Sequence, residues 1–316
     1  MKVFACDSFV LPLPEGHRFP MEKYALLREA VEDHPAVEIR LPEAATDEDL
    51  LRVHEAAWVA RVAGGALEPA DVRRIGFPWS LHLVERSRRS VGATLAAGRA
   101  ALAEGWAANL AGGTHHAFPG HGEGFCVFND VAVAARAVQA EGMARRIAVL
   151  DLDVHQGNGT AAVFRGDDDV FTLSVHGEGN YPFRKEPGDL DLGLPDGTGD
   201  DAYLAAVEAG VEAALAGGAD LAFYVAGADP WVGDRLGRLA VSADGLAARD
   251  RLVLDRCGAA GVPVAVVMAG GYAHRVQDTV AIHAATVLEA AERWTRRHGG
   301  RRVGGAARLS AAGTGA

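Results

Sequence analysis

The regular alternation of short apolar runs with helical stretches restricts the fold of this chain more than any other feature of its sequence. Apolar runs of strand length occur near residues 2–6, 37–41, 107–110, 147–150, 170–175, 221–226 and 263–268. Stretches with helical character lie at about 21–32, 85–104, 130–142, 200–215, 242–257 and 276–298, and two further helices are predicted to start at Thr46 and near Thr160. Strands that are separated by helices pair in parallel, because a parallel connection needs a long crossover. We therefore predict an α/β fold, a three-layer sandwich with a mostly parallel central sheet flanked by helices.

Length and composition limit the organisation of the chain. Of its 316 residues, 49% are hydrophobic, which supports one domain with a sizeable core over residues 1–298. Residues 299–316 are rich in Gly, Ala and Arg, and we predict that this tail is disordered. No apolar run approaches the roughly 20 residues of a membrane helix, so we expect no membrane span. A net charge of -11 disfavours direct nucleic acid binding.

The cysteines indicate a cellular compartment. Cys6, Cys126 and Cys257 are far apart and odd in number, which suits a reducing environment. The N-terminus also lacks a basic region followed by an apolar stretch. We expect a cytoplasmic protein, and the sequence makes no prediction of its oligomeric state.

Polar side chains follow the apolar run at 147–150. Asp151, Asp153 and His155 alternate with apolar residues, so on a continuing strand all three would point to one face. Burying two carboxylates and an imidazole together is unfavourable by several kcal/mol unless a cation holds them. These residues could instead cap the next helix. The alternation and the glycines that follow favour a metal site over that reading.

Three other strands also end in polar residues. His115 and His116 follow the run at 107–110, Asp229 follows the run at 221–226, and Tyr272 follows the run at 263–268. In parallel α/β sheets, ligands bind outside the carboxyl ends of the strands. We therefore predict that these residues and the 151–155 segment form a single active site.

The residue types indicate the chemistry of that site. Asp153, His155 and Asp229 would bind Zn²⁺ through two oxygens and one nitrogen, leaving a position open for water. A histidine at 115 or 116 could move the proton of that water. Tyr272 could donate a hydrogen bond to a developing oxyanion. Together these roles predict hydrolysis of an amide.

The motif series resembles that of the zinc-dependent histone deacetylase family. It comprises 112–117 (Gly-Gly-Thr-His-His-Ala), 151–159 (Asp-Leu-Asp-Val-His-Gln-Gly-Asn-Gly), 227–229 (Gly-Ala-Asp) and 270–272 (Gly-Gly-Tyr). Residues 155–159 and 233–237 resemble the class IV branch and its bacterial relatives, because classes I and II usually carry an Asp in place of Asn158. The resemblance implies the arginase–deacetylase fold.

The resemblance also implies a role for each matching residue. Asp153, His155 and Asp229 would hold one zinc ion. The other catalytic residues would be His116 as general base and acid, His115 paired with Asp151, Asn158 beside His116, and Tyr272 on the acyl oxygen. The substrate channel would include Phe125, Tyr181, Gly124 and Gly271, with Lys23 at its foot. A structural potassium ion would be bound by backbone oxygens of Asp151, Asp153, His155 and Val175 together with Ser174.

The implied reaction is removal of an acyl group, either acetyl or a longer fatty acyl, from lysine side chains in proteins or peptides. Dimanganese ureohydrolases need two further carboxylates, and this chain has Gly157 and Gly227 at those places. An acetylpolyamine or other small-molecule amidohydrolase remains an alternative. A catalytically inactive acyl-lysine-binding protein is disfavoured because the ligands and Tyr272 are all retained.

Overall fold

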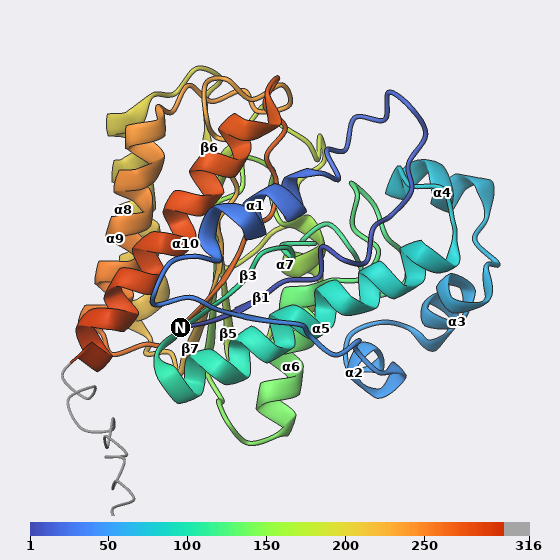
Figure 1. Ribbon diagram of the computed structural model, residues 1–316, viewed down its shortest axis with the longest axis horizontal. Coiled ribbons are helices and arrows are strands. Elements are labelled where there is room, and N and C mark those ends of the chain that lie inside the picture. The colour runs from blue at the N-terminus through green and yellow to red at the C-terminus, as the bar shows by residue number, and fades with distance from the viewer. Residues whose placement is uncertain (300–316) are drawn as a thin grey trace, which may run out of the picture.

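One sheet of eight parallel strands forms the centre of the molecule (Figure 1). The computed structural model describes residues 1–299. The strands follow the order β2-β1-β3-β8-β7-β4-β5-β6, and every pairing between them is parallel. Their bounds are β1 (Lys2–Phe4), β2 (Glu38–Arg40), β3 (Trp106–Asn109), β4 (Ile147–Asp151), β5 (Val170–Gly177), β6 (Leu190–Leu194), β7 (Leu221–Val225) and β8 (Val264–Val267). The predicted parallel sheet is confirmed.

Helices cover both faces of this sheet and give the predicted three layers. On one face lie α5 (Leu81–Glu104) and α6 (Asp130–Ala140). On the other lie α1 (Lys23–Val31), α8 (Asp200–Ala216), α9 (Ala243–Ala259) and α10 (Val276–His298). The shorter helices are α2 (Asp47–Leu51), α3 (Ala56–Gly64), α4 (Pro69–Ile75) and α7 (Asn158–Phe164).

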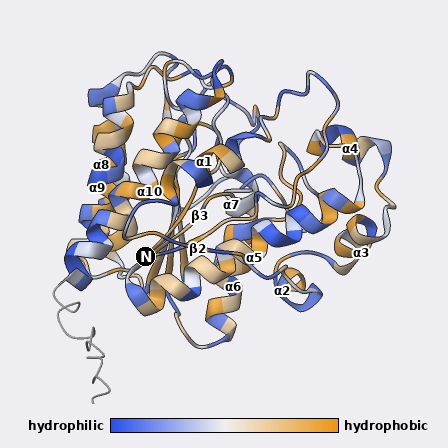
Figure 2. Cartoon of the chain, in the orientation of Figure 1, coloured by the Kyte–Doolittle hydropathy of each residue, from blue (hydrophilic) through white to orange (hydrophobic). Residues whose placement is uncertain are grey.

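The hydrophobic core lies on both sides of the sheet. In β4, Ala148 and Leu150 contact the layer of α1, α8, α9 and α10, whereas Ile147 and Val149 contact the layer of α5 and α6. Figure 2 shows hydrophobic colour along the central strands and mixed colour on the covering helices. Continuous apolar strands are expected in a parallel sheet that is covered on both faces.

The structure contains three elements that the sequence did not predict, namely β6, α3 and α4. β6 is an edge strand that pairs only with β5, and it contains Asp191 and Gly193 instead of an apolar run. The predicted start of α5 at residue 85 is also wrong. The helix begins at Leu81, because the side chain of Ser80 accepts a hydrogen bond from the backbone N–H of Leu83 and caps this end.

Two other predictions concern membrane-spanning helices and the C-terminal tail. None of the helices within residues 1–299 combines the length and apolar character needed to cross a bilayer. The tail that we predicted to be disordered lies, apart from Gly299, outside the described residues.

Candidate active site

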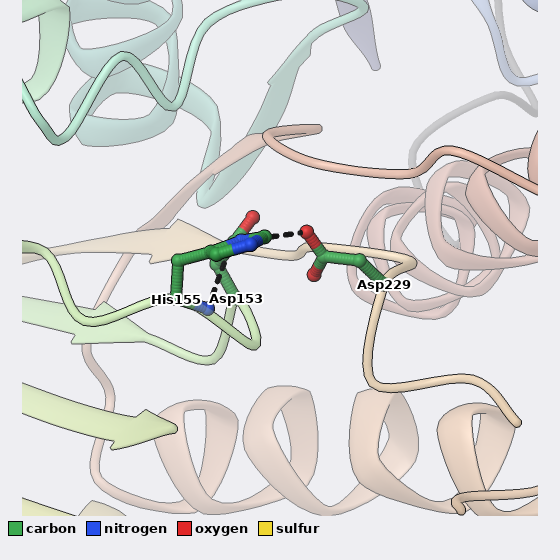
Figure 3. A group of neighbouring side chains, drawn as sticks. All are labelled: Asp153, His155 and Asp229. Atoms are coloured by element: carbon green, nitrogen blue, oxygen red, sulfur yellow. Dashed lines mark hydrogen bonds and ion pairs between the residues drawn. The ribbon is translucent and has the colours of Figure 1, made fainter. Parts of the chain in front are cut away.

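Asp153, His155 and Asp229 meet just beyond the carboxyl ends of β4 and β7. Their ligand atoms all lie within 4.8 Å of one another, and Figure 3 shows the three side chains pointing toward a common centre. Nδ1 of His155 lies 2.9 Å from Oδ1 of Asp153 and 3.2 Å from Oδ2 of Asp229. Two backbone N–H groups fix the carboxylates, since Gly270 donates to Asp153 and Val154 donates to Asp229. The cluster is therefore held rigidly.

The electrostatics of this cluster fit a divalent cation. Burial and repulsion from Asp153 raise the pKa of Asp229 to about 7. Burial would lower the pKa of His155, but hydrogen bonds and charge from the two carboxylates raise it to about 10. Apart from its ion-pair contact with Nδ1 of His155, Oδ2 of Asp229 is buried without a hydrogen-bond partner among residues 1–299. The carboxylates thus attract positive charge, and a bound cation would take the place of the proton on His155 and contact the buried oxygen of Asp229.

Asp151 does not join the cluster. β4 ends at Asp151, so the predicted placement of residues 151, 153 and 155 on one strand face is wrong. The following residues turn, with the backbone N–H of Asp153 and of His155 each donating to the carboxylate two residues earlier. The carboxylate of Asp151 instead lies 2.7 Å from Nδ1 of His115. Burial opposes a charge on His115, but Asp151 and Asp153 together raise its pKa to about 9.

His116 has a different set of partners from His115. Its Nδ1 lies 2.7 Å from Oδ1 of Asn158, and Nδ2 of Asn158 donates to Glu123 at 2.7 Å. Asn158 therefore links the imidazole to a carboxylate. Burial and the positive charges of His115 and His155 hold the pKa of His116 well below its usual range. A neutral imidazole with Nδ1–H bound to Asn158 leaves Nε2 able to accept a proton.

Tyr272 lies on the wall of the cavity that leads to the cluster. Its backbone N–H donates to the carboxylate of Asp234, and its carbonyl accepts from Nε of Arg235 at 2.8 Å. Burial raises the pKa of the Tyr272 hydroxyl well above its usual range, so this group stays a hydrogen-bond donor at neutral pH. Lys23 is buried behind the ring, 5.4 Å from its centroid, and donates to the carbonyl of Ala269.

A cavity of about 460 Å³ reaches the cluster from the surface. Phe125, Tyr181 and Gly124 line it, as the sequence predicted, together with His115, His116 and Tyr272. Gly271 was also predicted to line the channel, but it is not among the described residues that line this cavity. A Cβ at this position would instead meet the side chains of Thr279 and His283.

Asp151, Ser174 and Val175, which are predicted to bind potassium together with Asp153 and His155 of the cluster, lie where β4 and β5 pair. Asp151 is the register partner of Ser174, and Val175 follows in β5. The hydroxyl of Ser174 lies 2.9 Å from Nδ1 of His176. The structure thus brings these residues to one place.

Sequence reasoning missed two residues of the site. Glu123 lies in the loop at 120–124, which its glycines marked only as flexible, and Asp234 follows β7 by several residues. Both are carboxylates that hydrogen-bond to predicted catalytic residues, Asn158 and Tyr272. Asp234 lies in the 233–237 segment that resembles the class IV branch, but the partners of both residues are remote in sequence, so no local pattern indicated their roles.

Comparison with known proteins agrees with this geometry. The model of the family described as histone deacetylase domain matches residues 17–288. The chain belongs to the histone deacetylase family. It is 48% identical to an uncharacterized protein of Picosynechococcus sp. over 283 residues, which cover 87% of this chain and 93% of that one. It is 36% identical to a histone deacetylase-like amidohydrolase of Pseudomonas aeruginosa, over 75% of this chain and 66% of that protein. The chain is therefore a histone deacetylase-family amidohydrolase.

Solved structures share the fold. A crystal structure of an HDAC homolog complexed with SAHA superposes with a TM-score of 0.79 at 24% identity, covering 92% of this chain and 83% of that one. An acetylpolyamine aminohydrolase from Burkholderia pseudomallei gives a TM-score of 0.77 at 23% identity, covering 92% of this chain and 98% of that one. The arginase–deacetylase fold predicted from the motifs is confirmed.

Proposed function

We propose that this protein is a zinc-dependent hydrolase that removes acyl groups from lysine side chains. The observation that carries the proposal is the buried Asp153, His155 and Asp229 cluster in a cavity that His116 and Tyr272 also line. Two carboxylates and one imidazole would hold a zinc ion through three ligand atoms and leave it open to water. When bound, the metal would polarise the amide carbonyl and acidify water.

The protein's own residues would divide the remaining work. Nε2 of His116 takes the proton that water loses on attack and then delivers it to the departing lysine nitrogen. The neutral state of His116 suits the first of these transfers. The hydroxyl of Tyr272 donates to the carbonyl oxygen as negative charge develops there. Asp151 fixes the ring of His115, whose centroid lies 4.1 Å from that of His116 with the two rings tilted by 46°.

Close contacts at two glycines support a single metal ion. A Cβ at Gly157 would lie 2.2 Å from Oδ2 of Asp151, and a Cβ at Gly227 would lie 2.7 Å from Oδ2 of Asp153. The additional carboxylates of a dinuclear site have no space at these positions. Residues Asp151, Asp153, His155, Val175 and Ser174 are proposed to hold a separate structural potassium ion.

An acetylpolyamine hydrolase is the second candidate, because one structural neighbour bears that name. The experiment that separates the two offers the zinc-loaded protein an acetyl-lysine peptide and N-acetylspermidine at equal concentration. We expect faster release of acetate from the peptide. Release from N-acetylspermidine alone would contradict the proposal, and no release from either would favour an inactive binding protein. The Asp229→Ala variant, which lacks one ligand, is the negative control.

The acyl group itself is proposed to be acetyl or longer. Several apolar side chains line the cavity, including those of Leu11, Met21, Leu83, Val127 and Phe128. Each CH₂ buried there would add up to roughly 0.8 kcal/mol to binding. We expect octanoyl and myristoyl peptides to be hydrolysed at least as efficiently as the acetyl peptide. A steady fall in kcat/KM with chain length would show that only acetyl fits.

A further inference from the structure

The mouth of the active-site cavity carries charge of one sign. The charged side chains that line the cavity are Arg18, Arg73, Arg74, Arg86, Arg238 and Asp153. Arg86 and Asp153 are buried, whereas the other four are exposed. Within the described part of the chain, every charged lining residue that reaches solvent is therefore an arginine. We call Arg18, Arg73, Arg74 and Arg238 the arginine rim.

Neighbouring carboxylates do little to neutralise this rim. Arg18 and Arg73 form no ion pair with any residue between 1 and 299. Arg74 lies 3.8 Å from Asp71, whose other oxygen Arg61 already holds at 2.7 Å.

Arg238 does have a carboxylate partner. It lies 3.3 Å from Asp196, but this pair is about half exposed, so water screens it strongly. The rim thus keeps a positive field although the whole chain has a net charge of -11.

The rim is built by segments that are distant in sequence. Arg73 and Arg74 lie in α4, Arg18 lies in the loop before α1, and Arg238 lies in the loop between β7 and α9. A hydrogen bond of 2.9 Å between Nε2 of His17 and the carbonyl of Gly76 holds the first two segments together (Figure 1). The metal-binding cluster lies at depth, so the part of a substrate outside the scissile amide would lie among these arginines.

We propose that the arginine rim selects acyl-lysine in an acidic sequence context, with Asp or Glu residues flanking the modified lysine. This inference rests on the proposed lysine deacylase function and adds the class of substrate. Carboxylates beside the acyl-lysine would pair with the guanidinium groups, each pair contributing at most about a fivefold change in affinity. A polyamine would bring ammonium groups against the same guanidinium groups and would be repelled.

The test compares one acyl-lysine peptide in three versions, with flanking Glu, Gln or Lys. For the zinc-loaded protein we expect kcat/KM to be about 10-fold or more higher for the Glu peptide than for the Lys peptide, with the Gln peptide between them. Raising the salt concentration to about 0.5 M should largely remove this ratio, because exposed charges are screened. Binding of the same labelled peptides to zinc-loaded His116→Ala protein, followed by fluorescence anisotropy, should give the same order without turnover.

Charge reversal at the rim tests the assignment of residues. In the double variant Arg18→Glu/Arg73→Glu, we expect the ratio of the Glu peptide to the Lys peptide to fall below one. Arg251→Glu is the matched control. Arg251 is exposed on α9, at the opposite side of the molecule from α4 (Figure 1), and this variant should keep the wild-type ratio.

Failure of this inference and failure of the proposed function give different results. If the Gln and Lys peptides are hydrolysed at least as fast as the Glu peptide, the rim inference is overturned and lysine deacylation stands. The same holds if charge reversal at the rim leaves the ratio unchanged. If none of the three peptides is hydrolysed while N-acetylspermidine is, both the inference and the proposed function are wrong.

Discussion

At the scale of single residues, Glu123 supplies the carboxylate that position 158 lacks, because that position holds an Asn. Asn158 occupies the position beside His116 at which an Asp is usual in related classes, so the sequence alone predicts an uncharged partner. In the structure, Asn158 accepts from His116 and donates to Glu123, so the negative charge lies one residue further away. The same carboxylate lies 3.8 Å from Nε2 of His121. Glu123 is thus placed to orient Asn158 and, through it, the tautomer of His116.

Replacing Glu123 by Gln tests this arrangement. A Gln oxygen can still accept from Asn158, so the change removes the charge and keeps the hydrogen bond. We expect kcat to fall roughly 10-fold with the zinc content unchanged, because hydrogen bonds to ionised groups are about twice as strong as neutral ones. Glu48→Gln, a surface change on α2, is the control. Wild-type kcat in Glu123→Gln would show that the carboxylate only fills space.

Replacing Tyr272 by Phe tests the oxyanion contact. Its hydroxyl stays protonated because burial raises its pKa, and its hydrogen bond should strengthen as charge develops on the substrate oxygen. We expect kcat to fall about 10²- to 10³-fold with little change in KM. Steady-state kinetics on one acyl-lysine peptide measures both values. An effect confined to KM would make Tyr272 a binding contact only.

The sequence predicted most site residues at this scale because their motifs directly follow strands. Asp153 and Asp229 follow closely after the ends of β4 and β7, and His116 lies in the loop that follows β3. The pairing of Asp151 with His115 was also predicted through the family resemblance. Glu123 was not, because its role depends on a contact with Asn158, which is 35 positions away in the chain.

At the scale of elements, the sequence predicted the long helices and the buried strands well. Their apolar runs are continuous, as in β7, where all five residues are buried. α3 and α4 were missed because they are short and cover only a local core around Trp58 and Ile75, beside the start of α5. Local periodicity is weak in elements of this kind.

His54 lies in the loop between α2 and α3, contacts the start of α6, and should make the stability of the fold depend on pH. Its Nε2 accepts from the backbone N–H of Asn129, the N-cap residue of α6, and its Nδ1 donates to the carbonyl of Phe118. Burial outweighs the carbonyls of Pro119 and Phe118 and lowers the pKa of His54 to about 4. The folded protein therefore keeps this ring neutral where the unfolded chain binds a proton.

This difference in protonation of His54 means that acid should lower the free energy of unfolding. Above pH 6.5 both states are neutral and the full stability is present, and stability is lost as the pH falls from about 6.5 toward 4. His54 alone should contribute a loss of about 2 kcal/mol between pH 7 and pH 5. Urea unfolding of wild-type and His54→Gln protein at both pH values measures it, with exposed His82→Gln as control. Equal pH dependence of wild type and His54→Gln would refute the assignment.

At the scale of the whole molecule, the order of strands explains why the motifs meet. β3, β8, β7 and β4 are consecutive in the sheet, and the loops after them carry His116, Tyr272, Asp229 and Asp153. The sequence predicted a shared edge from the rule for parallel sheets. It could not predict the order of these strands, because β8 pairs with β3, where Trp106 is the register partner of Val264, and no local pattern indicates so distant a pairing. The charge of the cavity mouth emerges at the same scale, since three separate segments form it.

One zinc ion in this cluster is proposed to drive amide hydrolysis. The most direct measurement removes bound metal with a chelator and titrates Zn²⁺ back while following hydrolysis of an acyl-lysine peptide. We predict that activity disappears on removal and returns in proportion to zinc, reaching its plateau at one ion per chain. The Asp229→Ala variant should not regain activity at that ratio. Full activity without metal, or a plateau reached only at two ions per chain, would contradict the account.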